Sequence, residues 1–476
     1  MLIQPFFVSG LAHCSYLLAG SKSCAVIDPR RDVRVYLDAA NSLGVRITHI
    51  LETHLHADFV SGHMDLAEKT GAAIYAPRSA GCAFAHTGLA DGDVFHIEDM
   101  DVLVLETPGH TPEHIVYVVA DRSRGEDPVA LFSGDTLFVG DVGRPDLFPG
   151  IAEKLAGELH DSLYRKLMGL PDFCEVYPAH GAGSLCGREI SAKRTSTIGY
   201  EKRHNYALQI PDRKEFIRRL TTGMPAAPDH FSRCSETNRK GPARLKSLSA
   251  AVPLDPLSFS RRAEGAGVAV LDIRPYDAYG GLHVMGSFHI DLTSNFSTFA
   301  GWILPPEADI LLVADHRDQV ERASVLLRRV GLDRVTGFLE GGSFAWAASG
   351  FPLGHVPQLS VQDLNERICS GESAVLLDVR TVGEFEGGHI EGAIHIPVPD
   401  LRTRHGELDP EASIVAICNV GQRGTLAASL LKQRGFQRVS NLAGGMTAYN
   451  AATGGAECPV CALPHGPALS AGSGGR

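Results

Sequence analysis

The sequence predicts an α/β protein built of several domains. Short apolar runs, which are typical of buried strands, alternate with segments whose leucines recur every four residues, as in an amphipathic helix. Cys24–Ile27, Asp101–Leu105 and Ala130–Phe132 are such runs, and the leucines from Leu155 to Leu167 show the helical spacing. The chain has 476 residues. This is too long for one hydrophobic core and corresponds to about three domains of ordinary size.

The composition is that of a globular protein, with 44% hydrophobic and 21% charged residues. The net charge of −11 argues against a nucleic acid or an anionic membrane as a partner. The N-terminal stretch has no basic region, and no apolar run reaches about 18 residues. We therefore expect neither a signal peptide nor a membrane span, and we predict a cytoplasmic protein. The ten cysteines are mostly scattered singly, which is typical of reduced thiols.

The second half of the chain contains an internal repeat. The segment VLDIRPYDAYGGLHVMGSFHI, starting at Val270, resembles LLDVRTVGEFEGGHIEGAIHI, starting at Leu376, and RRVGLDRVTGFLEGGSFAW resembles KQRGFQRVSNLAGGMTAY. Each copy places a strand ending in Asp-x-Arg before a Gly-His loop, followed by a second strand and a helix. We therefore expect two homologous α/β domains with parallel sheets.

Composition also suggests the boundaries between domains. The polar stretch from Pro225 to Pro256 has little periodicity and is interpreted as a linker or an exposed connection. The predicted parts are a first domain at 1–240, repeated domains at 250–355 and 358–453, and a flexible tail at 454–476. The tail holds Cys458 and Cys461 at a redox or half-zinc spacing, but no second pair lies beside them and we assign them no function.

Histidines and aspartates follow predicted strands of the first domain, at the sheet edge where α/β proteins usually form their sites. They are His54, His56 and Asp58 in THLHADF, His110 in TPGHTPEH, Asp135 in LFSGDTLF and His180 in VYPAHGAGS. Any one histidine is more often an ordinary loop or core residue, whereas the whole set predicts a metal site. Neutral imidazoles with a carboxylate suit zinc, iron or manganese, and two histidines with one carboxylate are typical of non-haem Fe(II).

These motifs, in this order, resemble the metallo-β-lactamase fold. Within it they resemble the persulfide dioxygenases, relatives of glyoxalase II that oxidise the outer sulfur of a thiol persulfide. The resemblance implies an αββα sandwich with one Fe(II) per chain. By the same resemblance the metal ligands are His54, His110 and Asp135, and the groups that orient the ligands or iron-bound water are His56, Asp58 and His180.

Two positions near these motifs need separate interpretation. Phe59 stands where the dinuclear hydrolases and many persulfide dioxygenases have a histidine. It weakens a second metal site and leaves the mononuclear one intact. Arg144 is a candidate partner for a substrate carboxylate or a developing sulfur oxyanion, and a structural pair with Asp146 that fixes the loop is the alternative.

A second constellation lies in the last domain, where Cys418 stands between an apolar strand and a helix in VAICNVGQRGTLAASLL. Backbone N–H groups of such a turn point at the sulfur and stabilise a thiolate or persulfide, and Arg423 adds a positive charge. With Asp378-x-Arg380, GHIEGAIHIP and LAGGMTAY, this loop resembles that of a rhodanese. The resemblance implies a sulfurtransferase in which Cys418 carries a sulfane sulfur.

The middle domain lacks this nucleophile. The repeat aligns Ala314 with Cys418 and Gln319 with Arg423, so the middle copy resembles an inactive rhodanese that bridges and orients the other domains.

The whole chain resembles bacterial multidomain persulfide dioxygenase–sulfurtransferases of sulfide detoxification. This resemblance implies a glutathione, coenzyme A or similar persulfide as substrate, with O2, sulfite and thiosulfate, and a homo-oligomer. The direction of the rhodanese reaction stays open. The alternatives are a dinuclear zinc thioester hydrolase of glyoxalase II type with an accessory rhodanese, and a non-enzymatic sulfane-sulfur-binding protein.

Overall fold

The structure is a computed structural model that describes residues 1–224 and 227–453. These residues form two compact units. One comprises Met1–Leu248 with Val325–Asp333, and the other comprises the remaining described residues. The limits of the three domains stay a prediction. Among the described residues, no helix combines the length and the apolar character needed to cross a membrane.

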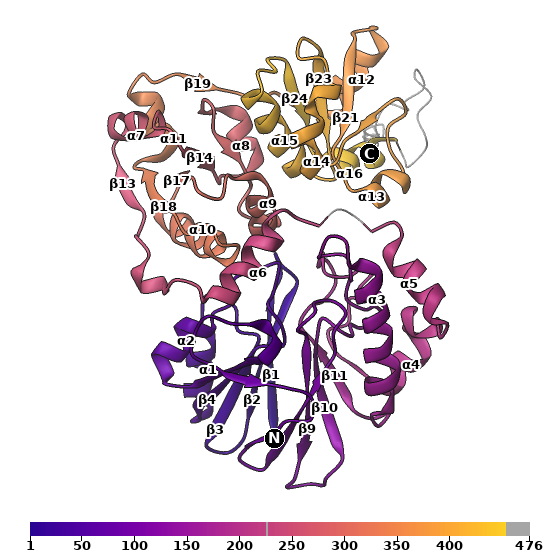
Figure 1. Cartoon of the computed structure of the whole chain (residues 1–476). Helices are drawn as coiled ribbons and strands as arrows, with labels where there is room; N and C mark the ends of the chain where they lie inside the picture. Colours follow the sequence, from indigo (N-terminus) through magenta and orange to yellow (C-terminus); the bar gives the residue numbers. More distant parts are fainter. Residues whose placement is uncertain (225–226, 454–476) are drawn as a thin grey trace, which may run out of the picture. The chain divides into compact units, whose positions relative to one another are not determined.

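The first unit contains two six-stranded sheets packed face to face (Figure 1). The strands of the first sheet, in spatial order, are β1 (Leu2–Val8), β2 (His13–Ala19), β3 (Ser23–Ile27), β4 (Arg46–Leu51), β5 (Ala73–Pro77) and β6 (Thr87–Leu89). Those of the second are β12 (Ser196–Thr197), β11 (Glu175–Pro178), β10 (Pro128–Gly134), β9 (Ile115–Asp121), β8 (Met100–Glu106) and β7 (Val94–Ile97).

Helices cover the outer face of each sheet (Figure 1). They are α1 (Arg34–Leu43) and α2 (His63–Thr70) on the first sheet, and α3 (Ala152–Asp161), α4 (Ile198–His204) and α5 (Arg213–Thr221) on the second. Buried Tyr16 and Phe132 pack between the sheets, while Tyr36 and Phe216 lie in the outer layers. This αββα layering confirms the fold predicted for the first domain.

The leucines with helical spacing run beyond one regular helix. After α3, the chain continues through a π turn at Ser162–Lys166 and a 3-10 turn at Leu167–Gly169. Leu155, Leu159, Leu163 and Leu167 are nevertheless all buried. The four-residue spacing therefore identified the buried face, although the helix type changes along it. Further 3-10 turns lie at Arg78–Ala80, Ala207–Gln209, Leu245–Ser247 and His405–Glu407.

The interpretation of 225–256 as a linker was wrong for part of that stretch, which contains α6 (His230–Lys240). The buried positions Phe231, Cys234 and Asn238 lie three and four residues apart on one face of this helix. Polar residues fill most of the other positions, and two buried positions, His230 and Asn238, are themselves polar. The helical period was therefore not visible in the apolar residues alone.

The two repeated domains have the same sheet topology. In spatial order, the strands of the middle copy are β13 (Val252–Leu254), β18 (Val335–Leu339), β17 (Asp309–Val313), β14 (Val268–Asp272) and β16 (Phe288–His289). Those of the last copy are β20 (Gln358–Leu359), β24 (Val439–Leu442), β23 (Ser413–Ile417), β21 (Ala374–Asp378) and β22 (Ile394–His395). Every neighbouring pair in these two sheets is parallel, which confirms the prediction from the repeat.

The Asp-x-Arg motif forms the same buried ion pair in both copies. In the middle copy, Nη2 of Arg274 lies 2.6 Å from Oδ2 of Asp272. In the last copy, Nη2 of Arg380 lies 2.7 Å from Oδ2 of Asp378. The helices of the middle copy are α7 (Pro256–Ala263), α8 (Tyr276–Gly281), α9 (Phe296–Ile303), α10 (Arg317–Arg329) and α11 (Gly342–Ala348), and β15 (His283–Val284) pairs with β19 (Leu353–Gly354). The helices of the last copy are α12 (Val361–Cys369), α13 (Val382–Glu386), α14 (Val398–Arg404), α15 (Gln422–Gln433) and α16 (Gly445–Thr453).

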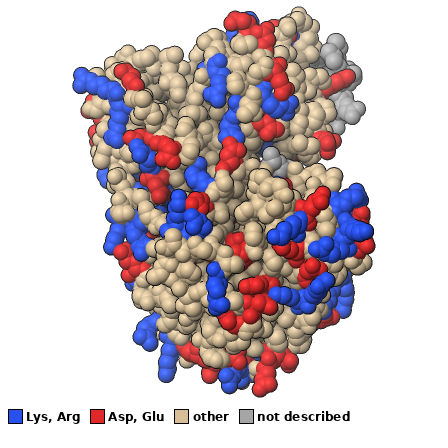
Figure 2. All heavy atoms as spheres, viewed as in Figure 1, with Lys and Arg blue, Asp and Glu red and all other residues tan. Residues whose placement is uncertain are grey.

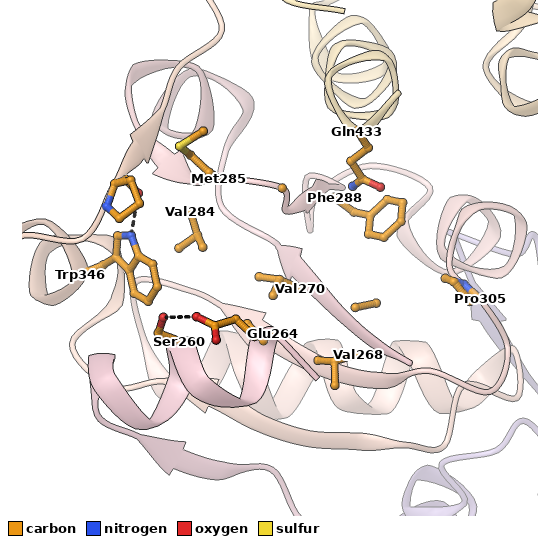
Figure 3. A pocket seen from close by; sticks show the side chains of 14 residues that line it. Ser260, Glu264, Val268, Val270, Val284, Met285, Phe288, Pro305, Trp346 and Gln433 are labelled. Carbon is orange, nitrogen blue, oxygen red and sulfur yellow. Dashed lines mark hydrogen bonds between the residues drawn. The ribbon is translucent and has the colours of Figure 1, made fainter. Parts of the chain in front are cut away.

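The middle copy has a surface hollow of about 480 Å³, shown in Figure 3. Apolar side chains such as Val284 and Trp346 line it, together with the polar groups of Ser260 and Glu264. On the face of the molecule drawn in Figure 2, acidic and basic side chains are interspersed.

Candidate metal centre and cysteine loop

Three buried side chains converge beyond the ends of β4, β8 and β10. The Nε2 atoms of His54 and His110 lie 3.8 and 3.2 Å from Oδ2 of Asp135. None of these three atoms has a hydrogen-bond partner among the residues that the structure describes. A buried polar atom left unpaired costs about 1–3 kcal/mol, so three of them facing one another fit a bound cation. The two nitrogens and one oxygen form a donor set for a metal ion.

Hydrogen bonds to the Nδ1 atoms of the two histidines determine that their Nε2 atoms face Asp135 Oδ2. His54 Nδ1 lies 2.9 Å from the hydroxyl of Thr53, which itself donates to Asp28, 3.0 Å from Oδ2. His110 Nδ1 donates to the carbonyl oxygen of Arg144 at 2.9 Å. Each Nε2 therefore keeps a lone pair for a metal. Burial lowers the pKa of both His54 and His110, which favours the neutral, ligating imidazole.

His180 lies between two carboxylates. Its Nδ1 is 2.7 Å from Asp135 Oδ1, and its Nε2 is 2.9 Å from Asp58 Oδ2. Burial opposes the charge, but the carboxylates outweigh it and raise the pKa of His180 well above its usual value. The buried thiol of Cys186 belongs to the same group. In this arrangement His180 orients the free oxygen of Asp135 toward His54 and His110, while both of its own nitrogens are engaged.

His56 faces a separate pair of carboxylates. Its Nε2 lies 3.1 Å from Asp28 Oδ1 and 3.9 Å from Glu52 Oε2. Phe59 is completely buried, with its ring centroid 4.4 Å from that of His56. The structure thus brings all six residues of the predicted set into one buried region, with His54, His110 and Asp135 grouped together and His56, Asp58 and His180 in two adjoining groups.

Sequence reasoning missed two residues that hold this region in place. His114 accepts the backbone N–H of Asp135 at 2.9 Å, and burial lowers the pKa of His114 to about 3, so it remains an acceptor. The second histidine of TPGHTPEH was the available signal. Asn238 of α6 donates to the carbonyls of His56 and Phe59, and its Oδ1 accepts the N–H of Ser61, each at 2.8 Å. No local signal pointed to Asn238.

Arg144 is held inside the loop that follows Asp135. Its guanidinium contacts the two oxygens of Asp146 at 2.6 and 2.7 Å and donates to the carbonyl of Leu185 at 3.2 Å. Its side chain is buried. This geometry favours a structural pair of Arg144 with Asp146 that fixes the loop. The substrate-binding role of Arg144 remains a prediction.

Cys418 follows β23 directly and precedes α15, as the sequence predicted. Its sulfur accepts the backbone N–H of Gly421 at 3.1 Å. Gly421 has a φ of 101°, a conformation that glycine adopts more readily than other residues. The tight turn that brings the amide to the sulfur therefore requires this glycine, and an amide directed at sulfur stabilises a thiolate.

Arg423 is clamped by Glu384, a residue that sequence reasoning missed. Its two terminal nitrogens each lie 2.7 Å from a Glu384 oxygen, and Asn419 donates to the same carboxylate at 2.6 Å. Burial raises the pKa of Glu384, but these bonds and those from Thr381 lower it to about 2. The signal was the capping box Thr381-x-x-Glu384 at the start of α13. Glu384 therefore ties the Cys418 loop to this helix.

The middle copy has a different loop at the equivalent position. Ala314 follows β17 as Cys418 follows β23. The side-chain oxygen of Gln319 accepts the N–H groups of Asp315 and His316 at 3.0 and 3.1 Å. The backbone amides of this loop, which occupies the place of the Cys418 loop, are therefore already hydrogen-bonded to a side chain of the same loop. The middle copy still reaches the Cys418 loop, because Gln422 donates to Thr293 at 2.9 Å. Cys458 and Cys461 lie outside the described residues.

Comparisons with known proteins agree with this architecture. Residues 9–180 match the model of the metallo-beta-lactamase superfamily, and residues 255–349 and 360–452 each match the rhodanese-like domain. A hydroxyacylglutathione hydrolase of Rhodospirillum rubrum is 39% identical over 41% of this chain, and the match spans 65% of that protein, slightly less than two thirds. A probable metallo-hydrolase of Burkholderia pseudomallei is 34% identical over 43% of this chain and 80% of its own length.

A solved structure extends the likeness beyond the first domain. The crystal structure of a metallo-beta-lactamase from Staphylococcus aureus is 34% identical, with a TM-score of 0.64. The match covers 71% of this chain and 98% of that one. The chain thus belongs to the metallo-beta-lactamase superfamily and carries two rhodanese-like domains after its metallo-hydrolase fold.

Proposed function

We propose that this protein oxidises low-molecular-weight thiol persulfides with O2 at one Fe(II), and that its last domain transfers sulfane sulfur through Cys418. The observation that carries the proposal is the convergence of the three unpaired buried atoms of His54, His110 and Asp135. Two histidines and one carboxylate with open positions are typical of non-haem Fe(II) that reacts with O2. His180 is meanwhile held on both ring nitrogens.

The proposed reaction converts a persulfide, O2 and water into a thiol, sulfite and two protons. Bound Fe(II) supplies the activation of O2, which a redox-inert metal such as zinc does not. In this proposal the protein holds the ligand histidines neutral, and it keeps Asp135 ionised through His180. The buried position of the three ligands also excludes bulk water.

The proposed second reaction takes place at Cys418. A Cys418 persulfide transfers its outer sulfur to sulfite, which gives thiosulfate and the free thiolate, and the reverse reaction uses thiosulfate as donor. The amide of Gly421 supports a sulfur anion at this position, and Arg423, although paired with Glu384, adds a weaker attraction to the sulfur. We assign the middle copy a role in orienting this loop, through the bond between Thr293 and Gln422.

A second candidate is a dinuclear zinc thioester hydrolase, because the R. rubrum relative is named a hydroxyacylglutathione hydrolase. Phe59 and the double engagement of His180 count against a second metal ion. A protein that only stores sulfane sulfur does not explain the three converging ligand atoms.

Metal analysis of the purified chain, combined with oxygen-electrode assays on glutathione and coenzyme A persulfides, tests the proposal. We expect about one iron per chain, as for a single two-histidine, one-carboxylate site, and oxygen uptake coupled to sulfite formation. Two zinc ions per chain with thioester hydrolysis and no oxygen uptake would refute it. Size-exclusion chromatography and cell fractionation test the predicted homo-oligomer and cytoplasmic location.

A further inference from the structure

His13 is a buried histidine beside the metal centre that the mechanism above does not use. It is the first residue of β2 and is fully buried. Its position is determined by backbone pairing, because the N–H of Cys14 donates to Ala179 at 2.7 Å and that of Gly181 donates to Ala12 at 2.9 Å. These two bonds place His13 directly opposite His180.

Neither ring nitrogen of His13 has a hydrogen-bond partner within residues 1–224 and 227–453. Burial, followed by the neighbouring His180 and His56, lowers the pKa of His13 well below its usual value. The imidazole is therefore neutral and offers one N–H donor and one lone pair. Because buried polar groups are nearly always hydrogen-bonded, these two atoms indicate a partner that is not part of the described protein.

The aromatic neighbours of His13 limit where this partner can lie. The His13 ring is 5.7 Å from that of His180 and 5.8 Å from that of His56, measured between centroids. Its apolar neighbour is Phe59, at 4.0 Å. His13 is therefore on the side of the centre occupied by His56 and His180, and its ring packs against that of Phe59.

We propose that His13 donates a hydrogen bond to the exogenous ligand of the metal centre, namely the terminal sulfur of the persulfide. This inference rests on the proposed function. A persulfide sulfur is anionic and accepts hydrogen bonds, and the buried imidazole N–H of His13, which has no partner among the described residues, provides a donor. The His13 ring, tilted by 40° relative to that of Phe59, thus provides a histidine at this side of the site, where residue 59 is a phenylalanine.

The test compares His13→Phe and His13→Gln with the wild-type full-length chain. His13→Phe keeps the ring and removes the donor, while His13→Gln retains an N–H group and guards against loss of folding by the phenylalanine. His96→Gln is a matched control, because His96 lies on β7 of the same unit with an exposed side chain. Metal content, the KM and kcat for persulfide, and the N–O stretching frequency of the Fe(II)–nitric oxide adduct are measured for each.

We expect His13→Phe to retain its metal and to lose about tenfold to a hundredfold in kcat/KM, the range for a hydrogen bond to a charged group. His13→Gln should recover part of this loss, and the N–O frequency should shift in His13→Phe but not in His96→Gln. Unchanged kinetics and an unchanged frequency, or a change only in melting temperature as expected for a buried structural water, would overturn the inference.

The experiments distinguish failure of the proposed dioxygenase function from failure of the proposed role of His13. Absence of oxygen uptake by the iron-loaded wild type refutes the dioxygenase, whereas the nitric oxide adduct still reports whether His13 faces a ligand on the metal. A frequency shift with unchanged persulfide kinetics contradicts the assignment of the sulfur as partner. Loss of metal from both His13 variants contradicts the ligand-facing role altogether.

Discussion

Replacing Asn238 by alanine tests whether α6 holds the metal-binding loop. The side chain is buried and makes three bonds of 2.8 Å to the loop that contains His54, with the carbonyls of His56 and Phe59 and with the N–H of Ser61. Alanine has no group that can replace them. The loop would then contain three buried backbone groups that must find other partners or open to water.

The magnitude follows from these three groups. Each lost hydrogen bond costs about 1 kcal/mol, and a buried group left unpaired costs up to about 3 kcal/mol, so we expect a loss of about 3–5 kcal/mol. In a domain of this size, a loss of about 3 kcal/mol lowers the Tm by about 6–12 °C. Because the same loop carries His54, metal affinity should fall by about a hundredfold or more if loop order and binding are fully coupled.

Calorimetry of the full-length chain and competition with a chelator measure the two effects. Asn238→Asp has nearly the same volume and keeps an acceptor for Ser61, but it sets a carboxylate against two carbonyl oxygens, so it should be at least as damaging. Ser232→Ala, on the exposed face of α6, is the matched control. If Asn238→Ala matches this control in both Tm and metal affinity, the loop does not depend on α6 and the reasoning is wrong.

Three further predictions concern other residues. Cys418→Ser should abolish thiosulfate formation and leave sulfite production from a preformed persulfide intact; equal loss of both in coupled assays would show that the sites do not act separately. Glu384→Gln should slow sulfur transfer and change the stability of the fold in acid. Because the pKa of Glu384 is lowered from 4.5 to about 2, the ionised carboxylate contributes fully to folding stability above about pH 4.5, and this contribution is lost as pH falls toward 2. Urea unfolding between pH 5 and pH 3 should therefore depend less on pH in the variant, and an identical pH dependence would contradict the role of the clamp. Phe59→His should raise the metal content above that of the wild type in elemental analysis, because it adds an imidazole next to Asp58 in the chain, and Asp58 already contacts His180. Unchanged stoichiometry would show that more than residue 59 prevents a second ion.

Much of the architecture could be predicted from sequence because its signals are local. The internal repeat predicted two parallel sheets, and both copies have the same strand order and the same buried Asp-x-Arg pair. The linker interpretation failed at α6, because a helix with a buried asparagine lacks the apolar period on which the prediction depended.

Which ligating or nucleophilic side chains follow strands could be predicted without coordinates, since strand, loop and residue type are all local properties. What each of these side chains contacts depends on the tertiary packing. His180 reaches Asp58 across 122 residues, and Asn238 reaches His56 across 182. Glu384, rather than the sulfur, receives the guanidinium of Arg423. Such partners depend on how distant segments pack, and single polar positions produce no periodicity from which the packing could be predicted.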